Sequence, residues 1–194
     1  MTHHANILVF RYRLARNCDI LVSAAALFPV AQFRPLAKYP AKTQRPRPVK
    51  QFRKLSDTMF VASQIEPRDL DEAVRAGLTL IVNNRPDGEE PDQPSGEDIA
   101  TAAQERNLAY TAIPITHSGF SDAQVDTFIK AIADSEGPVL GYCRSGTRSA
   151  FLWALAQAKR GADPGAIESA LAEAGYDMAP IRPSVEMLAA QRHG

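Results

Sequence analysis

The chain has 194 residues, of which 45% are hydrophobic, so it is long enough and apolar enough for one packed domain and a tail. Its 22 Lys and Arg balance its 22 Asp and Glu, which gives no indication of a nucleic-acid partner. Two cysteines, Cys18 and Cys143, are too few for a disulfide scaffold, and a reducing compartment such as the cytoplasm is expected.

Charge separates the N-terminal segment from the rest of the chain. Up to Lys54 the sequence carries 11 Lys or Arg and one acid, Asp19, whereas the remainder is acidic. Residues 1–48 are therefore predicted to be a basic, disordered tail or an extension upstream of the true start codon, and residues 49–194 to be the domain. A secretory signal or an organelle transit peptide is the alternative, and the protein would then be exported or targeted to an organelle. The apolar run at 20–31 is too short to span a bilayer.

From residue 59 onward, short apolar runs alternate with helical patterns. The apolar runs predict four buried strands, at 59–65, 78–82, 109–115 and 139–142. The helical patterns lie between and after them, at 68–76, 95–106, 121–133, from 147 onward, 163–174 and 183–191. This alternation predicts an α/β fold with a mainly parallel central sheet flanked by helices, and a functional site at the C-terminal ends of the strands.

The residues from Cys143 to Arg148 form the predicted turn between the last strand and its helix. Backbone N–H groups in such a turn point at one spot, with the positive end of the helix dipole behind them. Cys143 is therefore expected to be a thiolate nucleophile, and Arg148 to clamp an oxyanion through two parallel hydrogen bonds. The residues expected to surround the bound anion are Arg144, Ser145, Gly146 and Thr147.

Three further side chains are candidates for substrate binding. Ser149 is placed to hydrogen-bond either the thiolate or the helix backbone. Arg85 follows a central strand and would hold an anionic substrate, or else pair with Asp87, Glu89 or Glu90. His117 is a candidate acid or anion-binding group, and the alternative is an ordinary surface-loop histidine. The histidines show no metal-ligand spacing and no dinucleotide motif is present, so neither a metal nor a cofactor is expected.

Two family resemblances follow from these residues. The eight residues Cys-Arg-Ser-Gly-Thr-Arg-Ser-Ala, starting at Cys143, resemble the active-site loop of rhodanese-type sulfurtransferases. The segments at 60–65, 81–89 and 110–115 resemble the phosphatase-like domain of the beta-lactamase-hydrolase-like family. The second resemblance extends over roughly residues 50 to 190 and implies the dual-specificity (tyrosine) phosphatase fold.

The spacing in the loop distinguishes between the two chemistries. Phosphatases of this fold place five residues between the cysteine and the arginine. They also carry an aspartate, the general acid, on the loop after the strand that corresponds to residues 109–115 here. Here four residues separate Cys143 from Arg148, and Thr116 and His117 stand at the aspartate's place. The loss of one residue shortens the loop by about 3.5 Å, which suits a single sulfur atom better than a tetrahedral phosphate.

The expected function is therefore a cysteine-dependent sulfurtransferase that moves a sulfane sulfur through a Cys143 persulfide. The alternative is a cysteine-dependent phosphatase with a thiophosphate intermediate, and a second alternative is a non-catalytic anion-binding or redox-sensing module. The expected substrate is a small anionic sulfur or phosphate compound. A partner enzyme of sulfide oxidation fits the first expectation, and neither a nucleic acid nor a membrane span is expected.

Overall fold

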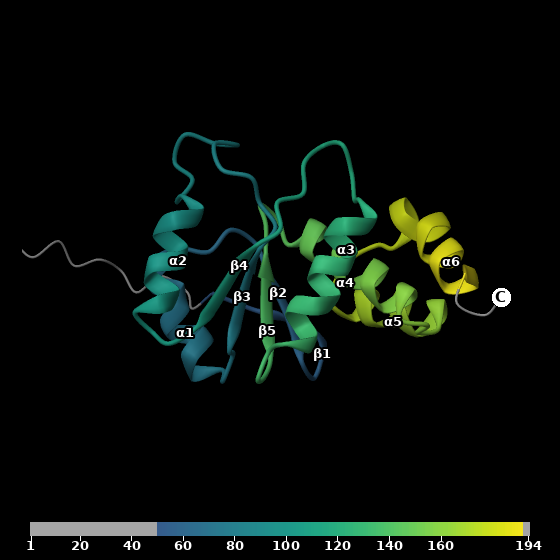
Figure 1. Ribbon diagram of the computed structural model, residues 1–194, viewed down its shortest axis with the longest axis horizontal. Helices are drawn as coiled ribbons and strands as arrows, with labels where there is room; N and C mark the ends of the chain where they lie inside the picture. Colours follow the sequence, from purple (N-terminus) through teal and green to yellow (C-terminus); the bar gives the residue numbers. More distant parts are fainter. Residues whose placement is uncertain (1–49, 192–194) are drawn as a thin grey trace, which may run out of the picture. The chain divides into compact units, whose positions relative to one another are not determined.

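The computed structural model describes residues 50–191 of the chain. Its centre is a five-stranded sheet in the order β1-β2-β5-β3-β4 (Figure 1). The strands are β1 (Arg53–Ser56), β2 (Met59–Ala62), β3 (Leu80–Asn83), β4 (Ala109–Ala112) and β5 (Val139–Tyr142). β2, β5, β3 and β4 are parallel, and β1 is antiparallel to β2. The expected mainly parallel α/β sheet is confirmed.

Helices cover both faces of the sheet. The helical elements are η1 (Pro67–Asp69), α1 (Leu70–Arg75), α2 (Gly96–Gln104), α3 (Asp122–Ala133), α4 (Thr147–Lys159), α5 (Pro164–Glu173), η2 (Ala179–Ile181) and α6 (Arg182–Gln191). α1 and α2 pack on one face, and α3 and α4 on the other, with α5 and α6 outside α4 (Figure 1). Each helix lies within a residue or two of its expected range, except the first, which begins as a turn of 3-10 helix.

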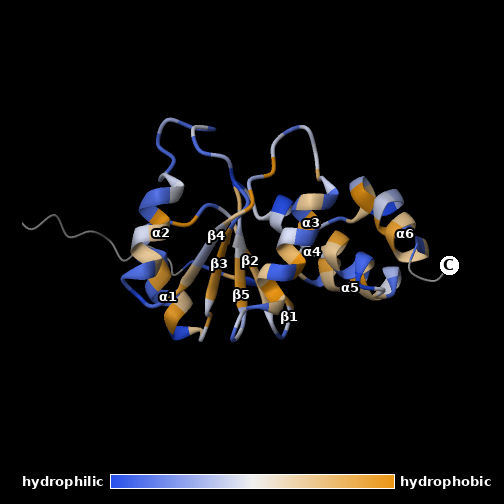
Figure 2. Ribbon diagram, viewed as in Figure 1, coloured by the Kyte–Doolittle hydropathy of each residue, from blue (hydrophilic) through white to orange (hydrophobic). Residues whose placement is uncertain are grey.

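The two faces follow from the alternation of side chains along each strand. Ile81 packs with α1 and α2, whereas its neighbours Leu80 and Val82 pack with the α3–α6 layer. All four residues of β3 and all four of β5 are buried, and apart from Asn83 at the end of β3 they are apolar or glycine. Both strands are mostly orange in Figure 2. This is the pattern expected for parallel strands covered by helices.

β1 was not expected from the sequence. It is an edge strand with two exposed residues at its start and an irregular register against β2. Its sequence, Arg53-Lys54-Leu55-Ser56, has a single apolar residue, which gives no alternation to recognise. The predicted ranges 59–65 and 109–115 were also too long at their C-terminal ends, because β2 ends at Ala62 and β4 ends at Ala112.

α4 is the most deeply buried helix of the described residues, with nine buried side chains. A Cβ atom at Gly141 would lie 3.1 Å from Ser149 Cβ and 2.9 Å from Met59 Cε, so a glycine in β5 allows α4 to pack close to the sheet. A side chain there would have to push the helix away. The close packing fixes the loop that joins β5 to α4.

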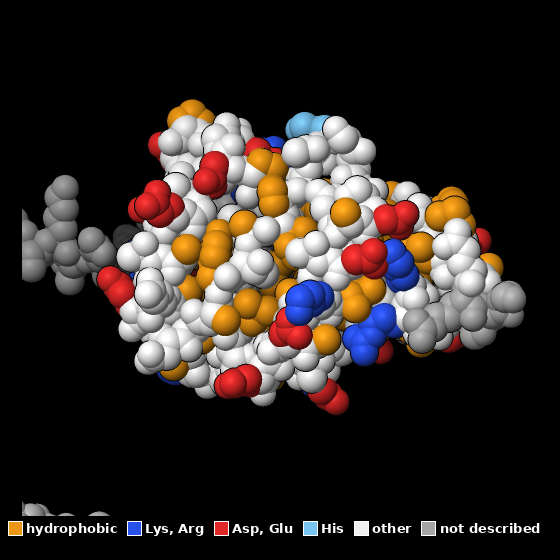
Figure 3. Space-filling model, viewed as in Figure 1, with side chains coloured by type: hydrophobic (Ala, Val, Ile, Leu, Met, Phe, Trp, Pro, Cys, Tyr) orange, Lys and Arg blue, Asp and Glu red, His pale blue; other side chains and the backbone are white. Residues whose placement is uncertain are grey.

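The loops at the C-terminal ends of the parallel strands meet at one edge of the sheet, uppermost in Figure 1. Two of them project from this edge, the loop between β3 and α2 and the loop between β4 and α3. Figure 3 shows the β4 side of the molecule, where apolar side chains gather between α2 and α3. Within residues 50–191 no helix has the length and hydropathy needed to cross a membrane. The predicted boundary between residues 48 and 49 lies outside the described residues and stays a prediction.

Candidate active site

Cys143 follows β5 directly and is fully buried. Its Sγ accepts a hydrogen bond from the backbone N–H of Gly146 at 3.1 Å. The turn that closes between these two residues leads straight into α4, which begins at Thr147. The sulfur therefore lies against a backbone donor and next to the N-terminus of a 13-residue helix, where negative charge is favoured.

Gly146 is the residue that makes this turn possible. Its φ of 92° lies in the left-handed region, which glycine adopts without a steric penalty. A Cβ atom at this position would lie 2.2 Å from Tyr176 Oη, a distance that no packing adjustment of a few tenths of an ångström relieves. Gly146 is thus required both by backbone conformation and by the tyrosine packed against it.

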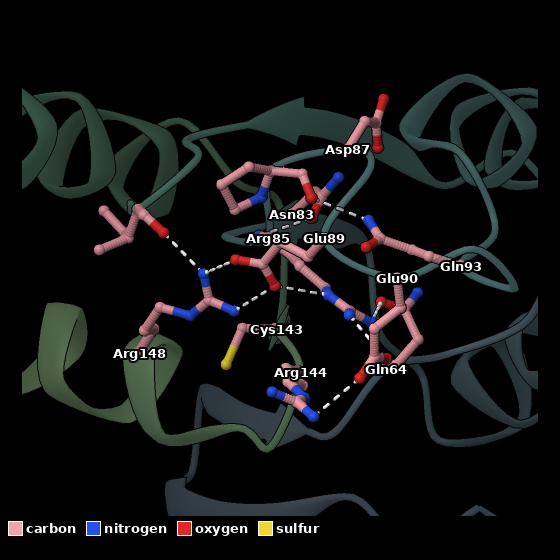
Figure 4. A network of polar contacts seen from close by, with 12 residues as sticks. Gln64, Asn83, Arg85, Asp87, Glu89, Glu90, Gln93, Cys143, Arg144 and Arg148 are labelled. Carbon is pink, nitrogen blue, oxygen red and sulfur yellow. Dashed lines mark hydrogen bonds and ion pairs between the residues drawn. The ribbon is translucent and has the colours of Figure 1, made fainter. Parts of the chain in front are cut away.

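Arg148, in the first turn of α4, is held by two partners from other parts of the chain (Figure 4). Its Nη1 donates to Glu89 Oε1 at 2.6 Å and to the Ile115 carbonyl at 2.7 Å, and its Nη2 donates to Glu89 Oε2 at 2.8 Å. A guanidinium has five N–H donors. The three bonds leave one edge of the group, with Nε–H and one Nη2–H. The guanidinium also interacts with Cys143, which raises the pKa of Arg148 after the larger effect of Glu89, so this edge can serve the sulfur or an anion bound to it.

Arg85 is the second arginine of the site and, unlike the half-buried Arg148, it is buried. Its side chain is 1% exposed, and all three of its nitrogens are engaged. Nε donates to Glu89 Oε2, Nη1 to Gln64 Oε1 and Nη2 to Glu90 Oε2, at 2.8, 2.9 and 2.8 Å. The ion-pair alternative from the sequence is confirmed for Glu89 and Glu90, whereas Asp87 instead accepts a hydrogen bond from the N–H of Gly96. A direct role of Arg85 in substrate binding stays a prediction.

Glu89 joins Arg85 to Arg148. Hydrogen bonding from Arg148 is the largest cause that lowers the pKa of Glu89 to about 2; burial opposes the shift and Arg85 adds to it. The hydrogen bond from Arg85 likewise lowers the pKa of Glu90, which also pairs with Arg144 at 2.8 Å. Both carboxyl groups are therefore ionised at neutral pH, and Glu89 has no proton to donate to a leaving group.

The other predicted residues lie around this centre in different environments. Arg144 and Ser145 are exposed, and Ser145 Oγ lies 3.1 Å from Thr147 Oγ1. Ser149 is fully buried, and its Oγ has no hydrogen-bond partner among residues 50–191, so a bond to the sulfur stays a prediction. His117 is exposed on the loop between β4 and α3.

Sequence reasoning missed the acidic half of this site. Glu89 and Glu90 entered only as partners of Arg85, and neither the bond from Glu89 to Arg148 nor the contribution of Gln64 was expected. The sequence did contain a signal for this contact. The segment that carries both glutamates follows β3, and β3 lies beside β5 in the sheet. The C-terminal ends of adjacent parallel strands lie side by side, which brings the loops that follow them together.

Comparison with protein families agrees with the fold. Residues 51–160 match the family described as "Beta-lactamase hydrolase-like protein, phosphatase-like domain". This range contains Cys143, Arg148 and the acidic segment, and it ends before Tyr176. The resemblance to this phosphatase-like family, stated from the sequence, is confirmed.

A curated relative and two solved structures show the same similarity. A beta-lactamase hydrolase-like protein of Xylella fastidiosa is 36% identical over 103 residues, which is 53% of this chain and 24% of the relative, so the chain spans about a quarter of that protein. A candidate phosphatase from Neisseria meningitidis is 28% identical with a TM-score of 0.64, over 72% of this chain and 97% of that one. Human DUSP28, at 17% identity and a TM-score of 0.54, matches over 74% of this chain and 95% of its own and shows the fold alone.

These findings establish a phosphatase-like fold and family. The description of the family and the name of the Neisseria structure agree with the phosphatase alternative rather than with the expected sulfurtransferase, and neither gives support to a role in sulfide metabolism. The choice between the two chemistries therefore depends on the geometry of the site.

Proposed function

The chain belongs to the family of phosphatase-like domains of beta-lactamase hydrolase-like proteins, and within that family we propose that it is a cysteine-dependent sulfurtransferase working through a Cys143 persulfide. The observation that carries the proposal is the state of Glu89, the carboxyl group hydrogen-bonded to Arg148. Both of its oxygens accept hydrogen bonds from guanidinium groups, which favours the ionised form, so Glu89 is not placed to act as a general acid, and Thr116 and His117 stand where an aspartate is expected. Sulfur transfer needs no such acid, because its leaving groups are stable anions.

The reaction has two steps that balance without an added oxidant or reductant. The Cys143 thiolate attacks the outer sulfur of the donor, the donor's sulfur–sulfur bond breaks, and the electron pair leaves on sulfite or on a thiolate. A second thiolate, or cyanide, then attacks the outer sulfur of the Cys143 persulfide and regenerates the thiolate. The Gly146 N–H and the free edge of Arg148 would stabilise the anionic sulfur in both steps.

The short loop supports the same proposal. Four residues separate Cys143 from Arg148, and among the loop's backbone amides Gly146 N–H donates to the sulfur. A phosphate group needs several donors around its three non-bridging oxygens. A single terminal sulfur needs fewer, and a loop shortened by one residue has one amide fewer to offer.

A cysteine-dependent phosphatase is the second candidate, and the family name and the phosphatase neighbours favour it. Its first step would transfer the phosphoryl group to Cys143 while the leaving alcohol takes up a proton. The loop after β4 carries Thr116 and His117 where related phosphatases are expected to carry an aspartate. His117 is the candidate proton donor for this alternative.

Initial rates on matched substrates test the proposal. The full-length protein should transfer sulfur from glutathione persulfide or thiosulfate to cyanide far faster than it hydrolyses p-nitrophenyl phosphate. Cys143→Ser should abolish transfer while leaving the melting temperature near that of the wild type. Efficient phosphate hydrolysis without sulfur transfer would replace the proposal by the phosphatase, and turnover of neither substrate class would replace it by the anion-binding or redox-sensing module.

A further inference from the structure

The charged side chains around Cys143 form a closed network, here called the arginine cage: Arg85, Arg144, Arg148, Glu89 and Glu90. Each arginine pairs with a glutamate, at distances between 2.6 and 2.8 Å. Three positive charges meet two negative ones. The cage therefore offers one unbalanced positive charge, which is what a single thiolate at Cys143 needs.

Glu89 takes up hydrogen-bond donors of two arginines of this cage. Both of its oxygens are bound to guanidinium groups, Oε1 to Arg148 and Oε2 to Arg148 and Arg85 (Figure 4). Its side chain is 20% exposed, so water screens its charge less than that of a surface carboxylate. A dianion bound at Cys143 would face this carboxylate across the Arg148 guanidinium.

The hydrogen-bond donors that remain in the cage also limit how much negative charge a bound substrate can carry. Arg148 has one free edge, because Glu89 and the Ile115 carbonyl take three of its five N–H groups. All three nitrogens of Arg85 are already bonded. One guanidinium edge and the Gly146 N–H suit an anion whose charge lies on one atom.

We propose that Glu89 is a specificity-determining residue and that the sulfur donor is an organic persulfide, not a dianion such as thiosulfate. This inference rests on the proposed sulfurtransferase function and names its substrate class. The reacting end of an organic persulfide carries one negative charge or none, whereas thiosulfate and phosphate monoesters carry two close to the reacting atom. Like charges brought together in a partly buried site repel strongly.

The proposed step balances in atoms and charge. The Cys143 thiolate attacks the terminal sulfur of R–S–SH, the donor's sulfur–sulfur bond breaks, and R–S⁻ leaves with the electron pair. The terminal sulfur and its proton become the Cys143 persulfide. The negative charge of the Cys143 thiolate is carried away by the donor's thiolate, and the charges of the five side chains of the cage do not change.

The test is the donor preference of Glu89→Gln, which keeps the size of the side chain and removes its charge. For each variant kcat/KM is measured with glutathione persulfide and with thiosulfate, and the inhibition constant of inorganic phosphate is measured with the persulfide. The wild type should prefer the persulfide. Glu89→Gln should raise the relative rate with thiosulfate, and tighten phosphate inhibition, by about tenfold.

Two further variants separate charge from structure. Glu90→Gln removes the second, more exposed carboxylate and should shift the same preference in the same direction by less, so the inference stays testable if Glu89→Gln does not fold. Glu105→Gln is the matched control, because Glu105 is 69% exposed and pairs with Arg106, outside the cage. It should leave the preference unchanged.

Three results would overturn the inference: a wild type that prefers thiosulfate, a parallel loss with both donors in Glu89→Gln, or an unchanged phosphate inhibition. A parallel loss would show that Glu89 only positions Arg148. Failure of the proposed function gives a different result, since no donor would then place sulfur on Cys143. Phosphate binding to each variant would still report on the charge of Glu89 in that case.

Discussion

The Cys143–Arg148 loop and the Arg85–Glu90 segment lie at the same edge of the sheet, but they are built in different ways. The loop is local, since one strand, one helix and one glycine place the sulfur and its N–H donor. The segment acts at long range, since Glu89 and Arg148 lie 59 positions apart in the sequence. The comparison shows that the nucleophile is positioned by its neighbours in sequence, whereas the charge around it is set by the tertiary fold.

Removal of Arg85 should have the largest effect on stability. Arg85→Met removes the buried guanidinium that Glu89 and Glu90 share, although Glu89 keeps Arg148 and Glu90 keeps Arg144. Loss of hydrogen bonds to charged, partly buried groups costs about 1–3 kcal/mol. Chemical denaturation should show this loss in the free energy of unfolding. Arg75→Met is the matched control, because Arg75 is 64% exposed, and it should cost less than about 1 kcal/mol. A small loss for Arg85→Met would mean that the segment does not depend on its arginine.

Arg148→Lys should have the largest effect on the rate among variants that keep the charge. An ammonium group cannot bind both Glu89 oxygens and the Ile115 carbonyl while presenting a second edge to the substrate. We expect a loss of about 100-fold in kcat/KM for sulfur transfer with little change in melting temperature. Arg160→Lys, an exposed change at the other end of α4, should keep the wild-type rate. A wild-type rate in Arg148→Lys would mean that charge alone is enough.

The difference between the two regions also explains which parts could be predicted from the sequence. The strand, turn and helix around Cys143 are encoded by consecutive residues, and so is the capping box of α3, in which Ser121 and Gln124 bond each other's backbone. The ion pairs of Glu89 depend on β3 lying beside β5, an order that periodicity along the chain does not contain. β1 was missed because its pairing with β2, not its own pattern, makes it a strand.

Acid should weaken the cage before it affects the loop. The pKa of Glu89 in the folded protein is about 2, against 4.5 for a free glutamate. A lowered folded pKa contributes stability above pH 4.5, and that stability is lost as the pH falls toward 2. After allowance for screening, the contribution is about 2 kcal/mol. The stability difference between the wild type and Glu89→Gln should therefore shrink between about pH 6 and pH 2, and a difference independent of pH would contradict the assignment.

Removal of the N-terminal segment should have the smallest effect. The basic composition of residues 1–48 predicts that they contribute nothing to the core or to either region of the site. A chain beginning at Val49 should match the full-length protein in melting temperature and in sulfur-transfer rate. A loss of several degrees, or insoluble expression, would place the boundary closer to the N-terminus.

The mass of the intact protein after one turnover tests the central claim most directly. Brief mixing with glutathione persulfide should add one sulfur atom to Cys143, as located by peptide mapping that also covers Cys18. Cyanide should then remove it, and Cys143→Ser should not gain a removable sulfur. An unmodified Cys143 after persulfide treatment, together with a phosphorylated Cys143 after mixing with p-nitrophenyl phosphate, would contradict the sulfurtransferase and establish the phosphatase.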